Sequence, residues 1–178
     1  MARYAILLRG INIGPSNRIP MAELRGLLTD DGFDDVATYL QSGNVVLSST
    51  LTPGAAARRC EELIAERFGL RIRALVRTHA ELDAVVRADP LAEAPANPKG
   101  YQVTFLESSP DPDIVPRLAA AATPEERFAV IGREIYAWHP DGIARSKLAT
   151  LLAGRAFQGA ATARNWTTVT ALLSMTAD

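Results

Sequence analysis

The order of the strands and helices that the sequence predicts constrains this chain most, because the same order occurs twice. In the first half, apolar runs and helical spacing alternate as strand, helix, strand, strand, helix, strand. That order is the βαββαβ unit of ferredoxin-like folds. The expected strands are 4–9, 36–40, 45–48 and 71–77, and the expected helices are 21–28 and 54–68.

The second half repeats this order after a short helix at 79–87 and a proline-rich surface connection at 89–98. We therefore predict an α+β protein with two ferredoxin-like subdomains, 1–78 and 79–178. The second subdomain includes the connecting segment 89–100 and a closing C-terminal helix. Its expected strands are 101–107, 128–131, 134–138 and 160–163, and its expected helices are 113–121, 145–153 and 166–175.

Composition limits the partners that we expect. The chain has 178 residues, of which 48% are hydrophobic, so it is long enough to bury a core. A formal net charge of −1 gives no general attraction to nucleic acid or to an anionic membrane, and we expect neither partner. The N-terminal apolar run 5–8 is too short for a signal peptide or a membrane span. We expect a cytoplasmic monomer or weak homodimer.

Few side chains in this sequence suit metal binding or catalysis. Cys60 is the single cysteine, and His79 and His139 are the only histidines, so we expect neither a metal nor a cofactor. We predict that Cys60 is buried in a helix and that His139 is a solvated turn residue at a strand end. None of the common catalytic motifs is present. The sequence leaves open whether the protein is an enzyme.

Basic residues gather in two segments that lack acidic residues. Residues 1–22 contain three arginines, residues 142–177 contain three arginines and one lysine, and all 20 Asp and Glu lie elsewhere. If these segments meet, their arginines and lysine, with nearby amides, suit a small anionic or phosphate-bearing ligand bound between the two halves. The candidate ligand-binding residues are Arg9, Asn12, Gln41, Asn44, Ser146, Lys147, Arg164 and Asn165.

We predict that five of these candidates converge on one concave surface. They are Arg9, Asn12, Lys147, Arg164 and Asn165. In the simpler alternative, the arginines are solvated, Asn165 only caps the last helix, and Trp166 anchors that helix in the core.

A second function stays open at this stage. In this alternative the chain is a non-enzymatic interaction module for a protein partner or single-stranded nucleic acid. Its binding surface would be an open sheet face carrying Arg71, Arg73 and Arg77. The same arginines also suit protection of an edge strand from aggregation.

Several motifs occur in an order that resembles one known family. They are Arg-Gly-Ile-Asn-Ile-Gly at 9–14, Met-Ala-Glu-Leu at 21–24, Tyr-Leu-Gln-Ser-Gly-Asn-Val-Val at 39–46, Val-Thr-Phe-Leu at 103–106, Pro-Asp-Gly at 140–142, Arg-Ser-Lys-Leu at 145–148 and Arg-Asn-Trp-Thr-Thr-Val at 164–169. Together they resemble the bacterial family called domain of unknown function 1697. The resemblance implies two ferredoxin-like subdomains and no established activity. Pro15 and Ala163 depart from the pattern, which has glycine and threonine there.

Overall fold

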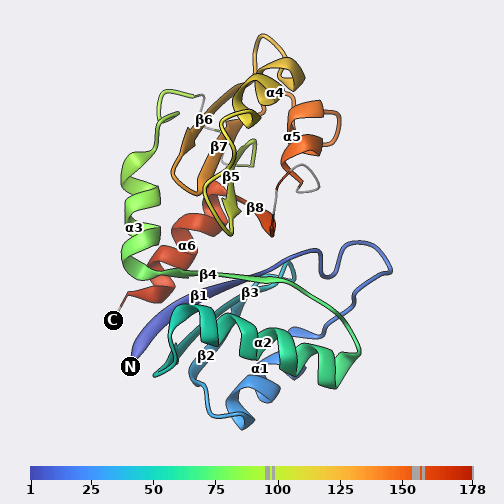
Figure 1. Cartoon of the computed structure of the whole chain (residues 1–178), viewed down its shortest axis with the longest axis vertical. Helices are drawn as coiled ribbons and strands as arrows, with labels where there is room; N and C mark the ends of the chain where they lie inside the picture. Colours follow the sequence, from blue (N-terminus) through green and yellow to red (C-terminus); the bar gives the residue numbers. More distant parts are fainter. Residues whose placement is uncertain (95–96, 98, 154–156, 158, 178) are drawn as a thin grey trace. The chain divides into compact units, whose positions relative to one another are not determined.

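The computed structural model shows two antiparallel sheets of four strands each, in an α+β fold (Figure 1). It describes residues 1–94, 97, 99–153, 157 and 159–177. The chain divides into two compact units: a first unit of Met1–Asp83 with Ala171–Asp178, and a second unit of Ala84–Thr170. Each unit has the βαββαβ order, so the predicted fold class is confirmed. None of the helices described is long and apolar enough to cross a membrane.

The first unit contains a sheet with strand order β2-β3-β1-β4, in which neighbouring strands are antiparallel. Helix α3 begins in this unit, and the end of the last helix belongs to it as well. The elements are β1 (Ala2–Leu8), α1 (Met21–Asp30), β2 (Asp34–Tyr39), β3 (Asn44–Ser49), α2 (Pro53–Phe68), β4 (Ala74–Thr78) and α3 (His79–Ala88).

Helices α1 and α2 pack on one face of this sheet. Their apolar residues meet alternate residues of β1, of which Tyr4, Ile6 and Leu8 are all buried. This alternation follows from the two-residue period of a strand. Cys60 of α2 is also buried, as predicted, and burial raises the pKa of its thiol to about 12. A thiol with such a pKa is a packing group rather than a nucleophile.

The second unit repeats the arrangement with strand order β6-β7-β5-β8. Helices α4 and α5 pack on one face of its sheet, where Leu118 and Leu148 meet Leu106 and Ile135. The predicted connection 89–100 includes residues 95, 96 and 98, which lie outside the described residues. The elements are β5 (Tyr101–Leu106), α4 (Ile114–Ala121), β6 (Arg127–Ile131), β7 (Glu134–Trp138), α5 (Lys147–Leu152), β8 (Ala161–Asn165) and α6 (Trp166–Thr176).

Candidate functional site

Four of the predicted ligand-binding residues lie at one end of the first sheet. Arg9 directly follows β1, and its backbone N–H donates to the carbonyl of Arg73 at 2.9 Å. Asn12 lies in the loop after β1, and its Nδ2 donates to the carbonyl of Gln41 at 2.8 Å. Gln41 and Asn44 belong to the turn between β2 and β3 and to the start of β3. The structure therefore brings Arg9, Asn12, Gln41 and Asn44 to the same sheet end.

Two of these residues hold the local backbone. The Nδ2 of Asn12 also donates to the carbonyl of Ile19 at 3.0 Å, and its Oδ1 accepts from the N–H of Ile19 at 2.9 Å. Asn44 is fully buried, and its Nδ2 donates to the carbonyl of Tyr39 at 2.9 Å and to Ser42 Oγ at 3.0 Å. Because both Nδ2 protons of Asn12 are already donated, Asn12 shapes the loop and has no side-chain proton left for a ligand.

The same end of the sheet is rich in positive charge. Arg18 lies in the loop between β1 and α1, and Arg71 precedes β4. Both side chains are exposed. Arg73 forms an ion pair with Glu61 at 3.3 Å. We call Arg9, Arg18, Arg71 and Arg73 the basic end of the first unit.

The arginines of the alternative interaction surface do not share one open face. Arg77 is only 1% exposed, and its Nη1 donates to the carbonyl of Val76 at 2.9 Å. Arg71 and Arg73 precede the strand, which begins at Ala74 rather than at residue 71. The expectation that Arg77 lies on an open sheet face is therefore wrong. The residues that alternate with these arginines, Ile72, Ala74 and Val76, pack in the core of the first unit.

Arg164 and Asn165 lie at the end of β8 in the second unit. The Arg164 side chain is buried, and its Nη1 donates to Thr162 Oγ1 at 2.7 Å and to the carbonyl of Ala163 at 2.9 Å. Burial lowers the pKa of this guanidinium to about 10. Asn165 Oδ1 accepts from the N–H of Thr168 at 2.9 Å, so the predicted cap of the last helix is confirmed. The ring of Trp166 stacks on Tyr101, with centroids 4.7 Å apart.

Ser146 takes part in a buried polar cluster with two residues that the sequence analysis did not connect to it. Its Oγ donates to Glu126 and also caps α5 by accepting from the N–H of Ala149 at 2.9 Å. The Nδ1 of His139 lies 2.7 Å from Glu126 Oε1 and 3.1 Å from Ser146 Oγ. We call Glu126, His139 and Ser146 the buried cluster. Lys147, the next residue, is exposed.

The prediction of a solvated His139 is wrong, because this side chain is fully buried and bonded to a carboxylate. Burial raises the pKa of Glu126, but the hydrogen bonds from His139 and Ser146 outweigh it, and the pKa lies below its usual value. Since 13 and 20 residues separate Glu126 from the other two, no sequence spacing marks the cluster. Its one sequence signal is a capping pattern, in which Thr123 and Glu126 bond each other's backbone N–H.

The buried cluster contains the three residue types of a hydrolase triad in a different arrangement. In a triad, the serine faces one ring nitrogen and the carboxylate the other. Here Glu126 and Ser146 both face Nδ1 of His139, and the serine hydroxyl already caps a helix. Nε2 of His139 is buried without a hydrogen-bond partner among the residues that the structure describes. The arrangement anchors the start of α5 to the end of β7.

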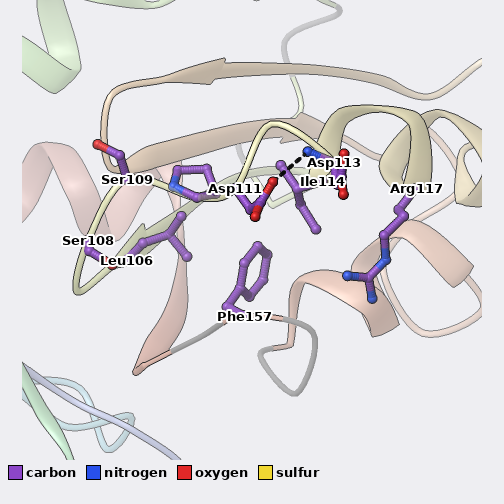
Figure 2. Close-up of a pocket in the computed structure, with 9 residues that line it drawn as sticks. Leu106, Ser108, Ser109, Asp111, Asp113, Ile114, Arg117 and Phe157 are labelled. Atoms are coloured by element: carbon purple, nitrogen blue, oxygen red, sulfur yellow. Dashed lines mark hydrogen bonds between the residues drawn. The ribbon is translucent and has the colours of Figure 1, made fainter.

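The second unit also has an open pocket of about 220 Å³ beside α4 (Figure 2). Leu106, Ile114 and Phe157 form its apolar side, and the first two are buried. The polar residues around it are exposed. They are Ser108, Ser109, Asp111, Asp113 and Arg117. The sequence analysis named none of them as site residues, because the loop 108–113 and Arg117 of α4 carry no recognisable motif.

The structure places the predicted candidates in two sets. Arg9, Asn12, Gln41 and Asn44 belong to the first unit, and the other four belong to the second. Convergence of the two sets on one surface stays a prediction. Arg155, one of the basic residues of the second acid-free segment, lies outside the described residues. Among the residues described, no group of three or more His, Cys, Asp and Glu side chains is placed to hold a metal ion.

The fold places this chain in the class of α+β proteins built from two βαββαβ units. The chain belongs to the family described as "Protein of unknown function (DUF1697)", whose model matches residues 1–136. It is similar in structure to the conserved bacterial protein SP0830 from Streptococcus pneumoniae, with a TM-score of 0.79 and 23% sequence identity over 99% of each chain. This likeness concerns the fold alone. No curated protein matches the sequence.

Proposed function

We propose that the chain binds a small anionic or phosphate-bearing ligand through the basic end of its first unit. The observation that carries the proposal is the position of Arg9, Asn12 and Gln41 at one sheet end. Two hydrogen bonds hold them there, from Arg9 N–H to the carbonyl of Arg73 and from Asn12 Nδ2 to the carbonyl of Gln41. Guanidinium groups suit oxyanions because their N–H donors match the geometry of phosphate and carboxylate oxygens.

The four candidate residues at this sheet end divide into supporting and contacting groups. Asn12 donates its amide protons to two backbone carbonyls, and Asn44 donates to a backbone carbonyl and to Ser42 Oγ. These two side chains therefore fix the loop and the turn. Arg9 is partly exposed and Gln41 is exposed, so these two side chains can reach a ligand. A fixed loop beside exposed donors lowers the ordering cost of binding.

Local charge favours an anion at this end despite the net charge of −1. The loop 9–20 and the turn 40–44 contain two arginines and no acidic residue. Glu61 lies near, but its carboxylate is engaged by Arg73 and by the backbone N–H of Ala74 at 2.8 Å. The attraction of Arg9 and Arg18 for an anion extends over about one Debye length, roughly 8 Å at physiological salt.

Thermal unfolding in the presence of pyrophosphate at constant ionic strength tests the proposal. At about a hundredfold excess over Kd, binding to the native state stabilises it by about 2.7 kcal/mol, which raises Tm by roughly 5–10 °C. Arg9→Ala should abolish this rise. Arg58→Ala is the matched control, because Arg58 is an exposed arginine near the start of α2, which follows the opposite end of β3. An equal rise in the wild type and in Arg9→Ala contradicts the proposal.

Lys147→Ala tests whether the second unit adds to the same site. Lys147 is exposed, so its removal changes charge without opening a cavity. If both sets of candidates serve one ligand, this variant should reduce the pyrophosphate-dependent rise in Tm as well. A full rise in Lys147→Ala limits the site to the first unit.

A further inference from the structure

We propose that the pocket beside α4 binds a small zwitterion with an apolar side group, of which a free apolar α-amino acid is the simplest example. This proposal is independent of the anion site, because the pocket is built entirely from residues of the second unit. Its basis is the combination of one apolar side, a carboxylate and a guanidinium around a single cavity of about 220 Å³.

The apolar side of the pocket suits a hydrocarbon group. Leu106 is 2% and Ile114 is 4% exposed, and Phe157 packs against the same core cluster. Figure 2 shows the side chains of Leu106, Ile114 and Phe157 directed toward one another. A ligand side chain placed on these groups loses apolar surface to solvent, which contributes about 25 cal/mol per Å².

Two carboxylates provide a place for an ammonium group. Asp111 Oδ1 accepts from the backbone N–H of Asp113 at 3.1 Å, and this bond fixes the Asp111 side chain. Figure 2 shows the Asp111 carboxylate directed toward the apolar side chains. Asp113 stands at the N-cap of α4, but its side chain makes no capping hydrogen bond. The two carboxylates therefore offer acceptor oxygens at the pocket, which suits a primary ammonium.

Arg117 supplies the opposite charge. It lines the same pocket one helical turn after Asp113, and its side chain is exposed. Figure 2 shows its guanidinium separate from the Asp111 carboxylate. A guanidinium can hold a ligand carboxylate by two parallel hydrogen bonds. With charges of both signs at separate points, the pocket complements a zwitterion better than a simple cation or anion.

The volume sets an upper limit on the ligand. Pockets for drug-sized molecules usually measure 300–1,000 Å³. At about 220 Å³, this pocket is smaller and suits a molecule of amino-acid size rather than a nucleotide.

Calorimetric titration of the full chain with L-leucine tests the proposal, with 3-methylbutylamine and 4-methylpentanoate as probes that lack one charge each. We expect saturable binding of leucine and at least about tenfold weaker binding of both probes, since each charged hydrogen bond contributes about 1.5–3 kcal/mol. Absence of saturable leucine binding overturns the proposal. Equal affinity for leucine and for the amine overturns the zwitterion assignment.

Two conservative variants assign the binding to this pocket. Asp111→Asn keeps the Oδ1 that accepts from Asp113, and Arg117→Gln changes an exposed side chain, so both should fold. We expect each to weaken leucine binding about tenfold or more. Exposed Asp141 and Arg58 supply the matched controls, Asp141→Asn and Arg58→Gln, which should bind normally. Unchanged leucine affinity in both pocket variants overturns the assignment.

Discussion

The backbone hydrogen bonds at the end of the first strand are the same in both units, but the first residue after the strand is basic in one unit and acidic in the other. In the first unit, Leu8 donates to Gly43 at 2.8 Å and Arg9 donates to Arg73 at 2.9 Å. In the second unit, Leu106 donates to the carbonyl of Arg133 at 2.9 Å and Glu107 donates to that of Ala160 at 3.0 Å. Arg9 and Glu107 therefore hold equivalent positions. The backbone ladder is repeated, whereas the charge that each sheet end presents is specific to its unit.

One charged residue is repeated in both units. Strand register pairs Ala5 with Arg77 and Val103 with Arg164, at equivalent places on the two sheets. In each case Nη1 of the arginine donates to the carbonyl of the preceding residue at 2.9 Å. A buried arginine is costly to desolvate, so its occurrence at both positions indicates a shared structural role on this strand.

The largest expected difference between the units is in the stability cost of an alanine at Gly43 and at its equivalent, Arg133. Gly43 has φ +83°, and a Cβ there would lie 2.8 Å from Ile11 Cδ1 and from Leu8 Cβ. We expect Gly43→Ala to lower the free energy of unfolding by about 3 kcal/mol, from left-handed strain and overpacking. Arg133→Ala should change it by less than about 0.5 kcal/mol. Urea denaturation measures both, and similar values would remove the distinction.

The next largest expected loss of stability follows removal of either buried arginine. Arg77→Ala and Arg164→Ala should each lower the free energy of unfolding by about 2 kcal/mol, because each removes a buried side chain and leaves backbone carbonyls without their donor. The comparison predicts similar losses in the two variants. Chemical denaturation of both under one condition checks this, and a large loss in one variant with none in the other would argue against equivalent roles.

The fold could be predicted from the sequence because local patterns determine its elements. Strand 134–138 was expected and is observed as Glu134–Trp138, since its apolar residues are flanked by a glycine turn. Strand 71–77 was placed too early, because the alternation of arginine and apolar residues begins before the hydrogen-bonded ladder, which starts at Ala74. Periodicity reports which residues face the core and does not report where pairing begins.

The candidate sites were harder to predict because they depend on contacts between distant segments. The acid-free first segment suggested Arg9 and Asn12, and the structure adds a hydrogen bond from Asn12 to Gln41. Convergence of Arg9 and Asn12 with the candidates of the second unit stays a prediction. His139 was misjudged because its partner, Glu126, precedes a different strand. The Asp111 pocket had no signal, since it forms only when a loop and a helix meet Phe157.

A third difference concerns Ser49 and His139, which hold equivalent positions at the end of the third strand of each unit. Ser49 pairs with Ala2 in the first unit, and His139 donates its backbone N–H to Gly100 at the equivalent place in the second. Only the second position carries a titratable side chain bonded to a carboxylate. Glu126→Gln should lower the free energy of unfolding at pH 7 by about 1.5 kcal/mol, because it removes the charge from the hydrogen bonds with His139, Ser146 and the backbone N–H of Thr123.

The pH dependence of this loss gives a sharper test. The folded-state pKa of Glu126 lies below the usual value of 4.5, because hydrogen bonds from His139 and Ser146 outweigh burial. Its stabilising contribution is therefore complete above the unfolded-state pKa and is lost as pH falls through the folded-state pKa. The unfolding free energies of the wild type and Glu126→Gln should approach each other in acid. A difference that stays constant from pH 7 to about pH 3 would contradict this.

The smallest expected effect distinguishes the helix caps at equivalent positions, Thr78 and Asn165. Thr78 Oγ1 accepts from the N–H of Glu81 at 3.2 Å, and the Glu81 carboxylate accepts from the N–H of Thr78 at 2.8 Å. Asn165 Oδ1 accepts from the N–H of Thr168. Thr168 has a hydroxyl where Glu81 has a carboxylate, so it provides no carboxylate for the N–H of Asn165. Loss of either cap should cost about 1 kcal/mol. Thr78→Ala should cost about 0.5 kcal/mol more, because it also removes the hydrogen bond from Thr78 Oγ1 to the Glu81 carboxylate at 3.1 Å. Denaturant titration of the two alanine variants measures this difference. Glu81→Gln keeps an acceptor oxygen but removes the charge. In this background the costs of Thr78→Ala and Asn165→Ala should become equal only if the extra cost comes from the charge of the Glu81 carboxylate.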